Sequence, residues 1–155
     1  MKTVFYFLVT SLMYFSTSVS ANESMSKRSA FAEKYFAAWN ITQKPNSTSE
    51  ELEAYLELLT DDVAWQHLPY QPDDTRKPEG KQNLRKGMAQ WLGVNTEYTA
   101  ELTNTIIGQN IIVLKFNALV KFANTEGKII TRKRDYTDVL ELDNGKVSLI
   151  RRYGK

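Results

Sequence analysis

The sequence predicts an α+β domain in which three helices pack on one face of a curved, mixed but mainly antiparallel sheet. Helical periodicity is confined to the first part of the chain, and everything after Gly93 reads as strand. The order is helix, helix, strand, helix and then four strands in a meander. Because no repeat or second domain interrupts this order, we expect residues 22–155 to form one domain.

The first 21 residues have the pattern of a secretory signal peptide. Lys2 gives a positive start, residues 4–15 are mostly apolar, and residues 19–21 are the small side chains that precede a cleavage site. The apolar run is too short to span a bilayer comfortably, so we expect no membrane anchor. We therefore expect export to the periplasm or the extracellular space, with residues 22–29 loosely attached to the domain.

Composition excludes several kinds of site. The chain has no cysteine, which excludes thiol catalysis, cysteine-based metal sites and disulfides, and its single histidine argues against a histidine-rich metal site. A formal net charge of +2 gives no electrostatic case for nucleic acid binding. We expect function to need neither a metal nor a cofactor.

Three helices are predicted in the first part of the chain. Apolar residues recur at helical spacing between residues 26 and 40. A second helix starts at the capping sequence 48–51, keeps an apolar face as far as Leu59 and ends at residues 61–62. A third covers residues 81–92 and is closed by Gly93.

Five strands are predicted around and after the third helix. The first is a short alternating segment at residues 63–68, and a proline-rich loop follows it. The other four are expected at residues 97–107, 110–123, 128–142 and 147–153. Hairpin turns at residues 124–127 and 143–146 connect the last three of these.

Asp138 is the first candidate for chemistry. On its strand it shares a face with Arg132, Arg134 and Tyr136. If that face turns towards the helices, the carboxyl group lies in a largely apolar cavity, where desolvation favours the neutral form that can donate a hydrogen bond. The alternative is that the face turns outward, or that Asp138 pairs with Arg134 or Arg152.

His67 and Tyr35 are the other two candidates. His67 ends the first strand, and its ordinary pKa makes it a usable base near neutrality. Tyr35 lies on the apolar face of the first helix, where its hydroxyl group can point into a pocket. The structural alternative is a hydrogen-bonded wall residue for His67 and core packing for Tyr35.

Aromatic residues come from every predicted layer. They can line a pocket for a flat apolar ligand or simply fill the core of the domain. The candidates for substrate binding are Trp39, Trp65, Trp91, Tyr98, Phe116 and Tyr136.

The chain resembles the SnoaL-like branch of the nuclear transport factor 2-like superfamily. The resemblance rests on the element order and on the segments 34–40, 59–67 and 136–146, and it implies a cone-shaped fold with a cavity. In the ketosteroid isomerases, which share this fold, a tyrosine and a neutral aspartic acid form the oxyanion hole and a carboxylate is the base. The resemblance implies these roles for Tyr35, Asp138 and, with histidine replacing the carboxylate, His67.

These observations lead to one function and two alternatives. The expected function is an exported domain whose cavity binds a small, mainly apolar carbonyl compound and transfers a proton beside the carbonyl group. The alternatives are a binding module without catalysis and a dimerising accessory domain. We also expect a homodimer that packs through the mixed sheet face of Lys115, Asn117, Leu119 and Lys121.

Overall fold

The computed structural model describes residues 7–154, with side chains from Ser24 to Gly154. Three helices and five strands follow the predicted order, which confirms the α+β fold class. They are α1 (Phe7–Thr42), α2 (Ser49–Leu56), β1 (Leu59–Leu68), α3 (Gly80–Ala89), β2 (Asn95–Ile107), β3 (Ile111–Ala123), β4 (Ile129–Asp143) and β5 (Lys146–Tyr153). The chain divides into two compact units, with the boundary after Phe31.

The first unit contains the N-terminal part of α1. Residues 22–29, which we expect to be loosely attached to the domain, are helical. No glycine or proline occurs before Pro45, so nothing in the sequence breaks the helix. The predicted signal peptide begins outside the described residues, and all of its side chains lie outside the described part of the chain. Its cleavage stays a prediction. Among the residues described, no helix is long and apolar enough to cross a membrane.

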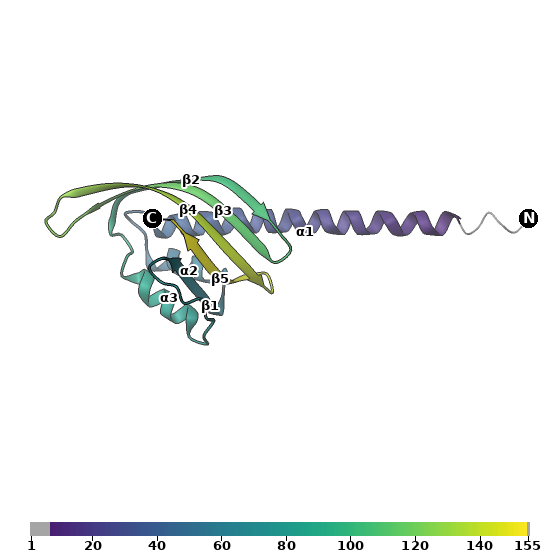
Figure 1. Ribbon diagram of the computed structural model, residues 1–155, viewed down its shortest axis with the longest axis horizontal. Coiled ribbons are helices and arrows are strands. Elements are labelled where there is room, and N and C mark those ends of the chain that lie inside the picture. Colours follow the sequence, from purple (N-terminus) through teal and green to yellow (C-terminus); the bar gives the residue numbers. More distant parts are fainter. Residues whose placement is uncertain (1–6, 155) are drawn as a thin grey trace, which may run out of the picture. The chain divides into compact units, whose positions relative to one another are not determined.

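The second unit is built on a five-stranded sheet in the order β1-β5-β4-β3-β2 (Figure 1). Strands β2 to β5 form the predicted antiparallel meander, and β1 runs parallel to β5 at its far edge. The sheet is therefore mixed, and β5 lies inside it although it is the last strand to be made.

Helix α2 is shorter than predicted. The capping box is present, since the side chain of Thr48 accepts from the backbone of Glu51 and the Glu51 side chain accepts from the backbone of Thr48. The helix ends at Leu56 instead of continuing past Leu59. Leu59 opens β1 and pairs with Val147, so sheet pairing overrides the helical pattern at this point.

Helix α3 lies against β1 at a point where only glycine fits. A Cβ atom on Gly80 would clash with the carbonyl oxygen of Val63 and lie 2.9 Å from the carbonyl carbon of Asp62. None of the residues in α3 is fully buried. Its apolar side chains Leu84 and Met88 are half-buried and line a cavity.

The core lies between the inner face of the sheet and the helices. As predicted, the even-numbered residues of β3 face inward, and those from Ile112 to Ala118 are buried. Phe36 of α1 packs against Phe116, while Tyr35 and Trp39 of α1 are buried against Tyr55 of α2. Two charged residues, Asp138 and Arg152, are buried in the same layer.

Candidate functional site

The centre of the site is an ion pair between β4 and β5. Asp138 accepts hydrogen bonds from Nε and Nη2 of Arg152, at 2.8 and 2.6 Å. The two residues are opposite each other in the ladder, and their exposed fractions are 1% and 5%. A bidentate pair of this kind is strong only where both partners are charged. Pairing of Asp138 with Arg152 is one of the alternatives that the sequence left open beside a neutral acid in an apolar cavity.

Four aromatic rings surround the guanidinium group of Arg152. Its central carbon lies 4.2 Å from the ring of Trp39 and 5.0 Å from those of Trp65 and Tyr136, with Phe116 at 5.5 Å. Burial alone would lower the pKa of Arg152, but the charge and hydrogen bonds of Asp138 raise it. Arg152 is thus a permanent cation held in one orientation by rings and by a carboxylate.

Two tyrosines from different helices lie beside this pair. The hydroxyl groups of Tyr35 in α1 and Tyr55 in α2 are 3.0 Å apart, and both side chains are almost fully buried. Burial raises the pKa of both, and for Tyr35 the nearby Tyr55 and Asp138 raise it further. Both hydroxyl groups are therefore neutral. Tyr55 had been assigned only to an apolar helix face, because helical spacing does not show where a hydroxyl group points.

His67 lies at the end of β1, between aromatic residues. Its ring centre is 5.3 Å from that of Tyr70 and 6.4 Å from that of Tyr136. Burial, followed by the positive charge of Arg152, lowers the pKa of His67, so the imidazole is neutral at pH 7. Its Nε2 atom is buried and has no hydrogen-bond partner.

A cavity of about 360 Å³ lies above the ion pair, between α1, the loop after α3 and the strands β2 to β5. We call it the arginine cavity. Arg152 forms part of its wall, and the Nε and Nη2 atoms of that residue are taken by Asp138, which leaves Nη1 for a ligand. Burial raises the pKa of Tyr98 in the same wall to about 12, against the opposing charge of Arg152. The lining residues are Trp39, Gln43, Trp91, Val94, Asn95, Tyr98, Val120, Phe122, Arg132, Arg134, Tyr136 and Arg152.

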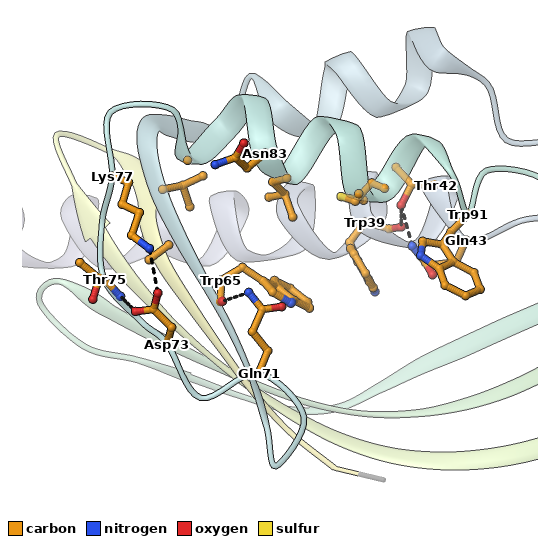
Figure 2. Close-up of a pocket in the computed structure, with 16 residues that line it drawn as sticks. Trp39, Thr42, Gln43, Trp65, Gln71, Asp73, Thr75, Lys77, Asn83 and Trp91 are labelled. Atoms are coloured by element: carbon orange, nitrogen blue, oxygen red, sulfur yellow. Dashed lines mark hydrogen bonds and ion pairs between the residues drawn. The ribbon is translucent and has the colours of Figure 1, made fainter.

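A second cavity, of about 410 Å³, lies under α3, and we call it the helix-side cavity (Figure 2). Trp39 and Trp65 lie at its centre, and Leu84 and Met88 of α3 contribute to its wall. At one end, the Asp73–Lys77 ion pair lies in the loop before α3. At the other end are Gln43 and Trp91, which together with Trp39 also line the arginine cavity.

The predicted substrate-binding residues divide between these spaces. Trp39 and Trp91 line both cavities, and Trp65 lines the helix-side cavity. Tyr98 and Tyr136 line the arginine cavity. Phe116 lines neither and is a core residue with an exposed fraction of 1%.

The three predicted catalytic residues are gathered around Arg152, but none of them lines either cavity. Tyr35 and Asp138 lie behind Arg152, each with a protein partner. The wall of the arginine cavity instead contains Arg132, Arg134 and Arg152, which are not among the predicted site residues. Strand alternation had already placed the first two on the face of Asp138, and that was the available signal. Within the part of the chain that is described, no group of His, Asp or Glu side chains could hold a metal ion.

Comparison with known proteins supports the fold. A family model described as a SnoaL-like domain matches residues 32–150. A protein from Shewanella putrefaciens named as a SnoaL-like polyketide cyclase is 17% identical, with a TM-score of 0.64 over 81% of this chain and 88% of that one. An epoxide hydrolase of the LEH-like type from M. tuberculosis is 14% identical, with a TM-score of 0.58 over 86% and 84%. At these identities the likeness shows the fold alone. No curated protein is significantly similar in sequence.

Proposed function

We propose, since the chain belongs to the SnoaL-like domain family, that its second unit binds a small carbonyl compound with an apolar body in the arginine cavity. We further propose that the protein is exported. The observation that carries the binding proposal is the state of Arg152, which is buried, fixed and permanently charged, and yet forms part of a cavity wall.

The wall chemistry supports a ligand of this kind. Rings of Trp39, Trp91 and Tyr98 offer flat apolar surface, while Nη1 of Arg152 offers N–H groups to an oxygen atom. Mostly apolar walls with a few fixed polar groups are typical of small-molecule sites. Because Asp138 and the surrounding rings hold the guanidinium in place, binding costs little reorganisation.

The test compares two probes that differ in one carbonyl group, namely 2-acetonaphthone and 2-ethylnaphthalene. We expect the wild-type protein to bind the ketone about tenfold more tightly than the hydrocarbon, measured by calorimetry or tryptophan fluorescence. The double variant D138L/R152M replaces the buried pair with apolar side chains, a change that folded proteins often tolerate. It should bind both probes equally.

A control variant separates the two cavities. Gly87 lines only the helix-side cavity, and its Cβ position meets nothing within 4 Å, so Gly87→Met narrows that cavity without a backbone clash. Ketone binding should survive this change. Loss of binding in Gly87→Met together with unchanged ketone preference in D138L/R152M would refute the proposal.

A second candidate is catalysis of proton transfer, and it rests on His67. The neutral imidazole has an unpartnered Nε2 atom and lies beside Tyr136, which lines the arginine cavity. His67 would take a proton from the carbon next to the ligand carbonyl, Arg152 would stabilise the enolate oxygen, and the proton would then return to carbon. Tyr35 and Asp138 would act as positioning residues, because Asp138 acts through its hydrogen bonds to Arg152 and Tyr35 acts through its hydrogen bond to Tyr55.

Deuterium exchange tests this candidate directly. In D₂O, NMR should show the protein speeding exchange at the methyl group of 2-acetonaphthone, and His67→Gln should lose the effect. Tyr70→Phe changes a neighbour of the imidazole without removing a base and should keep it. Binding of the ketone with no accelerated exchange would leave only the binding function.

A further inference from the structure

Two cations in the arginine cavity have no ion-pair partner. The second unit contains six arginines, and four of them form ion pairs with carboxylates, namely Arg76, Arg85, Arg151 and Arg152. Within the described residues, Arg132 and Arg134 form none, and both line the arginine cavity. Both arginines of this unit that lack an ion-pair partner among the described residues therefore line the same cavity.

The wall of this cavity offers no carboxylate to neutralise them. Among the residues that the structure describes, no Asp or Glu lines it, and Asp138 behind it is already paired with Arg152. Arg132 and Arg134 are alternate residues of β4 and so lie on the same face of the sheet. Arg132 is also held over the ring of Phe122, with its central carbon 5.0 Å from the ring centre.

The three arginines differ in depth. Arg132 is exposed, Arg134 is half-buried and Arg152 is almost fully buried. The inner arginine has its charge balanced, whereas the outer two do not. A ligand with a neutral oxygen at the inner end and a negative group at the outer end would match this order.

We infer that the arginine cavity selects an anion, specifically a small aromatic or alicyclic carboxylate whose carboxyl group is bound by Arg132 and Arg134. This inference rests on the proposed function, because it names the class of ligand for the same cavity. The planar fork of an arginine matches the two oxygens of a carboxylate, and the rings of Trp39 and Tyr98 provide the surface for the ligand body.

Two probes of similar size test the inference, 2-naphthoate and the uncharged 2-acetonaphthone. We expect the wild-type protein to bind naphthoate on the order of tenfold more tightly at low salt. High salt should reduce this advantage while leaving binding of the ketone unchanged, because only the charged interaction is screened.

A matched set of variants locates the effect. Arg132→Gln and Arg134→Gln should each weaken naphthoate binding several-fold more than they weaken ketone binding. Lys133→Gln removes the same charge from the same strand, but Lys133 lies on the opposite face and lines no part of this cavity. It should change neither affinity. An equal loss in Lys133→Gln and Arg134→Gln would overturn the inference, because the attraction would then be a general effect of net charge.

The outcomes for the wild-type protein separate the two levels of the argument. If the ketone binds and naphthoate binds no more tightly, the anion inference fails and the proposed function stands. If neither probe binds, both fail.

Discussion

Replacing Asp138 with leucine should destabilise the protein strongly, although the change removes a polar group from the core. From the sequence alone the opposite is expected, because a lone neutral acid in an apolar cavity can be replaced by leucine without loss. In the structure, Asp138 holds Arg152, which is 5% exposed and remains charged. The substitution would leave that charge buried without a partner.

The magnitude follows from this geometry. Breaking a buried pair by removing one partner costs about 3–5 kcal/mol. The apolar volume of leucine returns only part of this, so we expect a net loss of about 3 kcal/mol. For a domain of this size, 1 kcal/mol corresponds to roughly 3–4 °C, which predicts a fall in Tm of about 10 °C.

The assay is urea unfolding followed by circular dichroism, with the double variant D138L/R152M as the control. Removing both charges should return the free energy of unfolding to within about 1 kcal/mol of the wild-type value. A coupling energy of about 2 kcal/mol or more between the two positions would follow. If Asp138→Leu alone is as stable as the wild-type protein, the ion pair does not hold the core and the reasoning is refuted.

Four further predictions follow from other features. Gly80→Ala should lower the free energy of unfolding by about 1–3 kcal/mol, because the added Cβ meets the backbone of β1. Gly87→Ala in the same helix should raise it by about 0.5–1 kcal/mol. Urea unfolding of the two variants checks the sign of each change. The pKa of His67 is lower in the folded state than in the unfolded state. The stability that neutral His67 contributes is therefore present above the unfolded pKa near 6.5 and is lost as pH falls through the folded pKa. When Tm is measured from pH 8 to pH 5, it should fall less in His67→Gln than in the wild-type protein. Mass spectrometry of the exported protein should find residue 22 first, and intact Met1 in a membrane fraction would contradict export. Light scattering at micromolar concentration should give the mass of a homodimer, and Leu119→Lys in the outward row of β3 should reduce it to a monomer.

The fold was predictable because each element has its own local signal. Helical spacing, the capping sequence at Thr48 and the alternation of β3 each depend on neighbours in the chain. The sequence offered Arg152 as one possible partner of Asp138 but did not determine the pair, because the register of β4 and β5 depends on a bulge. An unbroken ladder from the 143–146 turn would place Arg151 opposite Asp138. The register shift between Glu141 and Leu142 brings Arg152 there instead.

The site was harder to predict than the fold for a related reason. Period-2 alternation places Arg132 and Arg134 on the face of Asp138. It does not show that these two arginines lack carboxylate partners. Whether an aromatic residue fills the core, as Phe116 does, or borders a cavity, as Trp91 does, depends on how closely α3 approaches the sheet. At Gly80 the approach of α3 to β1 leaves no room for a Cβ atom, and helical spacing does not predict such a contact between distant residues.

The position of β5 inside the sheet has a consequence for how the protein is made. Leu59 of β1 pairs with Val147 of β5, and Asp138 has no partner until Arg152 has been synthesised. During translation, β1 and Asp138 of β4 therefore remain unpaired until β5 has been synthesised. Pairing between residues so far apart in the sequence is slow. Until β5 inserts, the edges of β1 and β4 are unpaired and open to association with other chains. A nascent chain stalled before residue 146 should thus be a substrate for chaperones.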